Sequence, residues 1–404
     1  MTLTLRHKIM RLALTTLLGM ALFLGACKRK EDPSGFSHAA IDKTFQGKID
    51  INNPENYAMQ VVPTYITKDN GMANPISDRK ATIGRVLFYD KLLSVDGKTA
   101  CGSCHLQAYA FGDTATQSRG SNGLTGRHSM RLVNARFARE NKFFWNERAA
   151  SLEQQTSMPI QDHTEMGYSG ENGDPGIGVL IDKIKGTDYY QELFTWAYGS
   201  DDLSFVGEAT LQECLAQFVR SIQSFDSKYD KGRAMAPNDG APFQNFTASE
   251  NAGKQLFLSP PTFDASGNRI SGGLGCGGCH QAPEFDIDPN SRNNGIVGNL
   301  SNPAVLDLGN TRSPSLRELM NPDGELNGPF MHSANFGTMA SVIGHYNNIL
   351  IRPGNTNIDP RLTPNGNPQR LNISTSERSE LIAFLSTLNG TALYSAAKWS
   401  NPFP

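Results

Sequence analysis

The sequence predicts a mainly α-helical protein whose helices are joined by long loops rich in Gly, Pro and Asn. Apolar residues recur at helical spacing in residues 205–229, 339–346 and 374–388. The alternation of apolar and polar residues that marks a strand is scarce along the chain. Two similar phrases, at residues 83–88 and 251–257, each place a Gly shortly before Leu-Phe, which predicts an internal repeat.

The repeat predicts two halves. In residues 205–229, Leu211, Leu215 and Phe218 fall on one stripe, which predicts a single long helix closing the first half. Residues 232–242 are rich in Gly, Pro and Asn and are the best candidate for a linker. We therefore expect domains at residues 53–242 and 243–404. The last helix of the second domain is expected to begin at the capping signal Ser374-Thr-Ser-Glu377.

Composition limits the classes of protein to which this chain can belong. It has 404 residues, of which 38% are apolar and 19% are charged. Those proportions support a packed core and argue against a wholly disordered chain. The formal net charge is −2, and no block rich in Lys and Arg lies beyond the N-terminus. We therefore expect no nucleic-acid partner.

The N-terminus has the pattern of a targeting segment. Arg6, Lys8 and Arg11 precede an apolar stretch at residues 12–24, which is too short to span a membrane stably. The stretch ends in Leu-Gly-Ala-Cys27, which resembles a bacterial lipobox and implies cleavage before Cys27 and acylation of its thiol. An ordinary secretory signal followed by a chance Cys is the alternative. We expect residues 1–26 to be a lipoprotein signal peptide and residues 27–52 a flexible tether. The protein is then an exported bacterial lipoprotein on the periplasmic side of a membrane, either the inner or the outer membrane.

The remaining cysteines are unevenly distributed. Of the six Cys in the chain, four fall in two C-x-x-C-H strings, at residues 101–105 and 276–280. Cys27 belongs to the lipidation signal, so only Cys214 is left over, and it lies in the apolar stripe of residues 205–229. Such a residue is expected to be a small buried apolar side chain rather than a reactive thiol.

C-x-x-C-H is the attachment signal of c-type haem. Two thiols one helical turn apart add to the two vinyl groups of one haem, and the adjacent imidazole binds the iron. A thioredoxin-like redox pair or a zinc site are the alternatives. Zinc would need two further ligands at each pair, and the chain has only eight His. The sequence therefore predicts two tandem cytochrome-c-like domains with two covalent haems. The attaching residues are Cys101, Cys104, Cys276 and Cys279, and the proximal iron ligands are His105 and His280.

Between about residues 74 and 390 the chain resembles the bacterial di-haem cytochrome c peroxidases and the related MauG protein. The matching phrases stand at residues 84–90, 101–105, 143–148, 151–155, 159–167, 276–280, 312–317 and 328–332. The resemblance implies that Glu165 is the acid–base residue above the N-terminal haem and that Gln155 holds peroxide by hydrogen bonds. It also implies that Trp145 bridges the two haems and that His332 lies between them.

The sixth ligand of the N-terminal iron departs from the family pattern. Most members use a second His that would fall near residues 120–122, where this chain has none. The nearest is His128, which aligns instead with the calcium-binding Asn of the family. We therefore expect a five-coordinate or water-bound haem that needs no reductive activation, with ligation by His128 or His163 as the alternatives.

At the C-terminal haem, Tyr346 stands where most peroxidases of the family have Met and where MauG has Tyr. Met339, Val342, Ile343 and Tyr346 form one helical stripe that would face the haem. Ligation by Tyr stabilises ferric iron and lowers the potential. Met339 and His345 are alternative ligands. In the remaining alternative, Tyr346 is an aromatic residue of the core with no ligand role.

The resemblance also implies one calcium ion between the domains, with Asn327 and Pro329 as backbone ligands, although His128 in place of Asn is a poor calcium ligand. It implies hydrogen peroxide, a small electron donor (a cytochrome c or a cupredoxin) and a second copy of the chain as partners. We expect a cytochrome-c peroxidase whose electrons enter at the C-terminal haem and pass to the N-terminal haem. The alternatives are a MauG-like enzyme that oxidises a protein or organic substrate and a non-enzymatic di-haem electron carrier.

Overall fold

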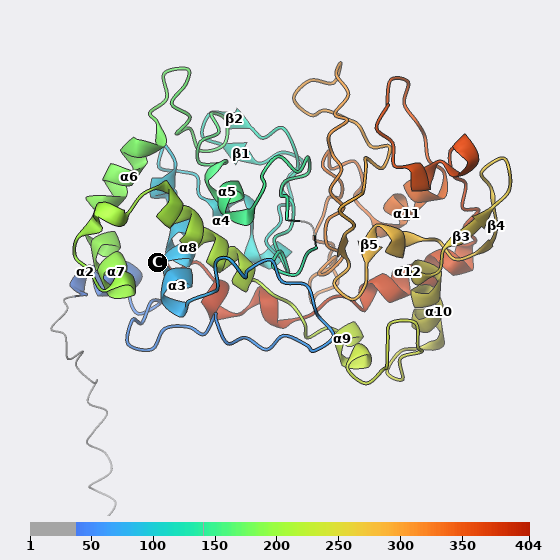
Figure 1. The fold of residues 1–404 in the computed structure, drawn as a ribbon, viewed down its shortest axis with the longest axis horizontal. Helices are drawn as coiled ribbons and strands as arrows, with labels where there is room; N and C mark the ends of the chain where they lie inside the picture. Colours follow the sequence, from blue (N-terminus) through green and yellow to red (C-terminus); the bar gives the residue numbers. More distant parts are fainter. Residues whose placement is uncertain (1–37, 140) are drawn as a thin grey trace, which may run out of the picture. The chain divides into compact units, whose positions relative to one another are not determined.

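The computed structural model describes residues 38–139 and 141–404, and within them it is mainly helical (Figure 1). The N-terminal part holds α2 (Ala39–Phe45), α3 (Asp78–Tyr89), α4 (Cys101–Cys104), α5 (Leu152–Ser157), α6 (Ile177–Lys185), α7 (Asp188–Tyr198), α8 (Glu208–Ser221) and α9 (Lys228–Arg233). The C-terminal part holds α10 (Ala248–Leu258), α11 (Met339–Asn347) and α12 (Thr375–Ser386). The predicted signal peptide and Cys27 lie outside the described residues.

The strands are short and form three two-stranded antiparallel sheets. They are β1 (Arg119–Gly120) with β2 (Gly123–Leu124), β3 (Pro261–Phe263) with β4 (Arg269–Gly272), and β5 (His280–Gln281) with β6 (Asp286–Ile287). The scarcity of strand and the long loops confirm the predicted fold class. No helix within residues 38–139 and 141–404 combines the length and the apolar character needed to cross a membrane.

The internal repeat is present as two similar helix pairs, α3 with α8 and α10 with α12 (Figure 1). In each pair a Gly of the first helix touches the backbone of the second. A Cβ on Gly84 would lie 2.0 Å from the Cys214 carbonyl oxygen, and a Cβ on Gly253 would lie 1.9 Å from that of Glu380. Only Gly allows helices to approach so closely, which explains why both phrases contain it.

Gly253→Ala should therefore lower the free energy of unfolding by about 1–3 kcal/mol, because α10 and α12 must separate to admit the methyl group. Chemical denaturation measures the change. The matched control is Gly178→Ala in α6, where a Cβ would meet nothing within 4 Å. That variant should be up to about 1 kcal/mol more stable, since Ala is the better helix former. Equal effects of the two substitutions would contradict the packing argument.

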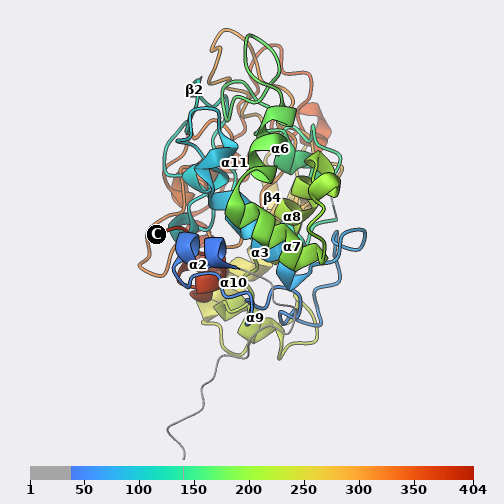
Figure 2. The ribbon, with the colours of Figure 1, turned by 90° about the vertical axis from the view of Figure 1, so that its left-hand side faces the viewer.

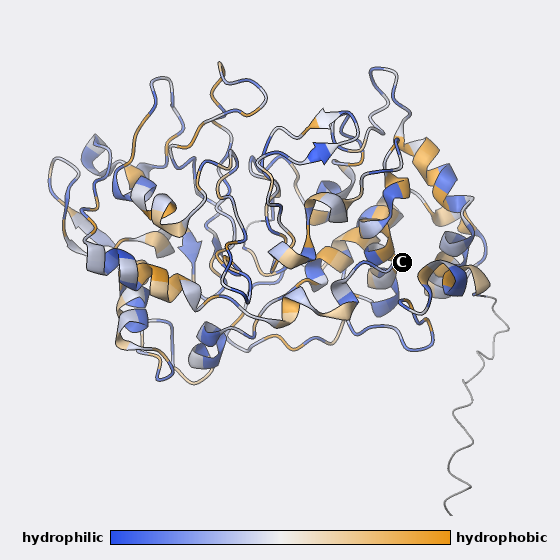
Figure 3. Cartoon of the chain, turned by 180° about the vertical axis from the view of Figure 1, so that it is seen from behind, coloured by the Kyte–Doolittle hydropathy of each residue, from blue (hydrophilic) through white to orange (hydrophobic). Residues whose placement is uncertain are grey.

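The helices bury apolar faces against aromatic cores, and in Figure 3 they carry both apolar and polar positions. In the C-terminal part, Tyr229, Phe257, Phe285 and Phe384 pack in one buried cluster. Cys214 is fully buried in α8, as predicted, and its sulfur lies 3.6 Å from the Tyr198 hydroxyl. It is a core residue of the pair formed by α3 and α8.

The prediction of one helix over residues 205–229 is wrong. Helix α8 ends at Ser221, and α9 begins after Ser227, whose hydroxyl accepts the Asp230 amide in a capping box. Between the two, the side-chain amide of Asn134 bonds both backbone groups of Ser224, at 2.8 and 3.1 Å. The extended segment thus has its polar groups satisfied by a residue far away in sequence.

The predicted tether is wrong for its described part. Residues 39–45 form α2, which lies beside α7 (Figure 2). The Glu192 carboxylate of α7 accepts the backbone amides of Ala40 and Ile41 at 3.1 and 2.9 Å, and so caps α2. Ile41 and Phe45 are fully buried. This apolar pair at i and i+4 anchors the segment to the fold.

Residues Ala39–Pro404 form one compact unit. The proposed boundary between residues 242 and 243 remains an interpretation of the sequence repeat.

Candidate functional site

The first C-x-x-C-H string has the geometry of a haem-binding segment. Cys101 and Cys104 begin and end α4, so their side chains are one helical turn apart. His105 follows, and its Nδ1 lies 2.9 Å from the Phe111 carbonyl oxygen. Burial lowers the pKa of His105, which keeps the ring neutral, so Nδ1–H donates to the carbonyl. Nε2 is then the free base that a metal requires.

The second string borders a large cavity. Cys276 to Gly278 form a 3₁₀ turn, and His280 begins β5. The cavity has a volume of about 530 Å³, within the range of cofactor sites. Its walls include Phe257, Cys276, Cys279, His280, Tyr346 and Leu381.

The ring of His280 is suited to bind a haem iron. Burial lowers its pKa to about 4. The Pro314 backbone opposes this shift of the pKa, and Nδ1 of His280 has no hydrogen-bond partner among the described residues. A neutral, buried imidazole in a cofactor-sized cavity fits the role of proximal ligand.

The structure brings Glu165 to the first string. Its backbone amide bonds the Asp162 carboxylate at 3.0 Å, and its carbonyl accepts the Ser121 amide at 2.8 Å. Burial raises the pKa of Glu165 to about 7, with the Asp162 charge adding to the rise and Arg148 opposing it. The carboxyl is close enough to Cys101 and Cys104 to influence both sulfurs electrostatically. A carboxyl with this pKa exchanges protons readily near neutral pH.

Gln155 lies on α5, in the turn that the Ser151 hydroxyl caps by accepting the Gln154 amide. Its backbone amide bonds the Ser151 carbonyl at 3.0 Å, and its side chain is half-buried. Among the described residues no hydrogen-bond partner occupies its side-chain amide. That amide is therefore available to another molecule, although the structure shows no contact between Gln155 and Glu165.

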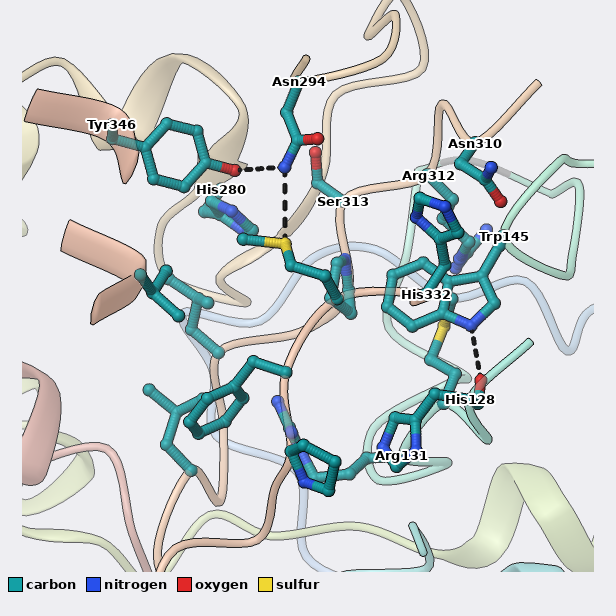
Figure 4. A pocket seen from close by; sticks show the side chains of 18 of the residues that line it. His128, Arg131, Trp145, His280, Asn294, Asn310, Arg312, Ser313, His332 and Tyr346 are labelled. Carbon is teal, nitrogen blue, oxygen red and sulfur yellow. Dashed lines mark hydrogen bonds between the residues drawn. The ribbon is translucent and has the colours of Figure 1, made fainter. Parts of the chain in front are cut away.

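Trp145 lies in a smaller cavity together with His280 and His332 (Figure 4). Its Nε1 donates to the His128 carbonyl at 2.8 Å, and its backbone carbonyl accepts the amide of Arg312 at 3.1 Å. The rings of Trp145 and His332 meet edge to face, with centroids 6.1 Å apart. The structure therefore connects Trp145, from the N-terminal part, with residues of the C-terminal part that border the second string.

The comparisons with known proteins agree with this geometry. A family model described as di-haem cytochrome c peroxidase matches residues 78–236. The chain is 27% identical over 329 residues to the methylamine utilization protein MauG of Methylophilus methylotrophus, covering 80% of this chain and 86% of that protein. It is also 27% identical over 358 residues to a cytochrome-c peroxidase of Denitromonas iodatirespirans. That match covers 79% of this chain and 83% of the peroxidase. Residues 78–236 thus match a di-haem cytochrome c peroxidase domain, and the chain as a whole is similar to both MauG and cytochrome-c peroxidases.

Solved structures share the fold of this chain. A MauG-like protein associated with microbial copper homeostasis superposes with a TM-score of 0.64 at 26% identity, covering 84% of this chain and 98% of that one. A variant of the diheme peroxidase BthA from Burkholderia thailandensis superposes with a TM-score of 0.59 at 19% identity. The superposition covers 82% of this chain and 92% of that one. Similarity to c-type di-haem proteins implies haem c as the cofactor.

Three residues were candidates for the sixth ligand of the predicted C-terminal haem. Tyr346 borders both cavities, whereas Met339 borders only the smaller one. The Nε2 of His345 is 2.9 Å from the backbone carbonyl oxygen of Asn294. That nitrogen is therefore already paired, and Tyr346 is the candidate whose side chain lines both cavities together with His280 (Figure 4).

The alternative ligands of the N-terminal haem, His163 and His128, are each bonded through Nδ1, which leaves Nε2 available as at His105, so both alternatives stay open. Nδ1 of His163 is 2.7 Å from the Asp174 carboxylate, and the side chain is exposed. Nδ1 of His128 is 2.8 Å from the Ala115 carbonyl oxygen. The loop at residues 120–122, where the family's distal His would fall, packs on Thr164 and Glu165 instead.

The predicted calcium site has mixed support in the geometry. Asn327 Oδ1 is buried without a hydrogen-bond partner, which suits a cation. However, the Asn327 carbonyl accepts the Arg131 guanidinium at 3.1 Å, and a positive group there disfavours calcium. No cluster of three or more His, Cys, Asp or Glu able to hold a metal occurs in residues 38–139 and 141–404. Calcium ligation by Asn327 and Pro329 stays a prediction.

Sequence reasoning missed three residues that shape the site. Asp162 and Arg148 set the electrostatics of Glu165, and Asn294 holds both His345 and Tyr346. Asp162 lies in a string that the family shares, so its position was a usable signal. Asn294 lies in a polar loop with no periodicity, and only the folded chain brings it to α11.

Proposed function

We propose that this protein reduces hydrogen peroxide to water with electrons from a small redox protein, a cytochrome c or a cupredoxin. Electrons enter at the C-terminal haem and pass to the N-terminal haem. The observation that carries the proposal is the Glu165 carboxyl, which lies near both cysteines of the first haem string and has its pKa raised to about 7.

The haem iron, when bound, supplies electrons and a position at which peroxide can bind. Cleavage of the O–O bond also needs a proton moved from the inner to the outer oxygen, and Glu165 can accept and return it. The free amide of Gln155 orients the peroxide by hydrogen bonds. Because the raised pKa lies near neutral pH, Glu165 can both take up and release this proton.

Trp145 and His332 provide the connection between the two halves. Their rings touch within a cavity that His280 also borders, and the Trp145 indole is fixed by the His128 carbonyl. A rigid aromatic pair between the haem segments favours rapid electron transfer, which supports an assignment of Trp145 to the inter-haem route.

Stopped-flow mixing of the purified di-haem protein with a reduced small cytochrome and peroxide tests this function. Two donor molecules should be oxidised per peroxide consumed, without prior reductive activation. Failure of peroxide to oxidise the donor, in a protein that carries two haems, would exclude the peroxidase.

A MauG-like oxidation of a protein or organic substrate is the second candidate. It is favoured by Tyr346 beside the second haem string and by the absence of His from residues 120–122. Peroxide added without a donor would then give a long-lived oxidised spectrum that decays when the substrate is supplied. A peroxidase would instead turn over steadily with the small cytochrome.

The cellular setting is part of the same proposal. We propose an exported lipoprotein, acylated at Cys27 and held on the periplasmic side of a bacterial membrane, which binds one calcium ion and forms a homodimer. Metabolic labelling with palmitate should mark the wild-type chain and not Cys27→Ala. Unlabelled wild-type protein would reject the anchor.

A further inference from the structure

Asn294 contacts the candidate iron ligand of the second haem site. Its side-chain nitrogen Nδ2 donates to the Tyr346 hydroxyl oxygen at 2.9 Å (Figure 4). Both residues border the 530 Å³ cavity that His280 and the second haem string line. The hydroxyl oxygen of Tyr346 therefore meets a hydrogen-bond donor on the side chain of a neighbouring loop.

Other contacts fix the orientation of this amide. Asn294 Oδ1 accepts the Ile296 backbone amide at 3.1 Å, which assigns the oxygen to that side. Nδ2 also lies 3.4 Å from the Met331 sulfur, so both of its hydrogens have an acceptor. The side chain consequently faces Tyr346 as a donor and not as an acceptor.

The backbone of Asn294 ties the same loop to α11. Its carbonyl lies 2.9 Å from Nε2 of His345, the residue before Tyr346. The Tyr346 carbonyl in turn accepts the Gln369 side-chain amide at 2.8 Å. The end of α11 that carries Tyr346 is thus held by the Asn294 loop and by Gln369, which keeps the phenol oxygen near the Asn294 amide.

A donor of this kind matters because an oxygen that binds iron carries negative charge. A hydrogen bond to a charged acceptor is stronger than one to a neutral acceptor. It also withdraws electron density from the ligand, and partners of ligands tune metal sites in this way. Ferric iron is then stabilised less by the same tyrosine.

We propose that Asn294 is a positioning residue for the C-terminal haem: its amide holds the Tyr346 oxygen and raises the reduction potential of that haem. The inference rests on the proposed ligation by Tyr346 and does not depend on peroxide turnover. It makes Asn294 the residue that moderates the low potential expected of Tyr ligation.

Asn294→Ala and Asn294→Asp test the role in the intact di-haem protein. Ala removes the donor, and Asp replaces it with an acceptor that carries negative charge. The midpoint potential of the C-terminal haem, measured by spectroelectrochemistry, should fall in Ala and fall further in Asp. The electron paramagnetic resonance signal of its ferric form should shift in both. Asn357→Asp is the matched control, because its amide donates to Leu308 at 3.0 Å and does not touch Tyr346.

Only variants that retain two haems per chain are compared. If Asn294→Asp does not retain both haems, the result for Asn294→Ala alone decides the test. A potential that is unchanged or higher in the Asn294 variants overturns the inference. A Tyr346→Phe protein with a wild-type ferric spectrum overturns it as well, because its premise is then wrong. Peroxide turnover is scored separately, so a wild type that lacks turnover but shows these shifts rejects the peroxidase and retains the role of Asn294.

Discussion

Replacing Glu165 by Gln should lower the turnover number for peroxide by about 10²–10⁴-fold, the usual contribution of a general acid–base group. Gln has nearly the same shape but cannot accept the proton of the inner peroxide oxygen. The backbone bonds of Glu165 to Asp162 and Ser121 do not involve the side chain, so the loop should keep its conformation. Steady-state turnover with a reduced small cytochrome measures the loss.

The matched control is Glu171→Gln, the same substitution at an exposed position six residues along the chain. It should leave turnover unchanged. Both proteins should carry two haems and bind small exogenous ligands alike. Equal rates for Glu165→Gln and the wild type would remove Glu165 from the mechanism.

The pH dependence of the same rate follows from the raised pKa of Glu165. The carboxylate form accepts the proton, and this form is populated above a pKa of about 7. The rate of peroxide cleavage by the wild type should therefore fall as the pH drops through 7, whereas Glu165→Gln should show no such step. A wild-type profile that is flat between pH 6 and 8 would contradict the assignment.

Features set by local sequence were predictable from it. Helix α12 begins after Ser374, whose hydroxyl accepts the Glu377 amide in the predicted capping box. The two C-x-x-C-H strings depend on neighbours within five residues. The position of the Gly in each repeat could be found from the sequence. Its contact with a partner helix is visible only in the structure.

Features decided by distant contacts were not predictable. The break between α8 and α9 depends on Asn134, about ninety residues earlier in the chain. The start of α2 depends on Glu192, whose carboxylate caps it. In both cases a side chain far along the chain satisfies backbone groups, and no spacing pattern in the local sequence records that.

The candidate site shows the same division. Glu165, Gln155 and Trp145 were found because they stand in short strings shared with a family. The pKa of Glu165 was not predictable, since burial, Asp162 and Arg148 act through space. Asn294 was missed for the same reason, because its contact with Tyr346 joins a loop to helix α11, about fifty residues further along the chain.

Arg317→Met should lower the free energy of unfolding by about 3–5 kcal/mol, the cost of breaking a buried ion pair. The Arg317 side chain is fully buried, and its guanidinium bonds the Asp230 carboxylate at 2.8 and 2.9 Å. It also donates to the Pro283 carbonyl at 2.9 Å, three residues beyond His280. Loss of the cation leaves the Asp230 charge buried, and its remaining hydrogen-bond partners in the described part of the chain are neutral, namely the Tyr65 hydroxyl and Ser227.

Chemical denaturation of the di-haem protein measures this loss. Arg352→Ala, at an exposed position, should change stability by no more than about 0.5 kcal/mol. The double variant Arg317→Met with Asp230→Asn removes both charges and should recover part of the loss, because the main cost lies in the unpaired carboxylate. If the double variant were less stable than Arg317→Met by the full effect of Asp230→Asn alone, the two residues would be energetically independent. The ion pair would then not be what joins α9 to the loop after the second haem string.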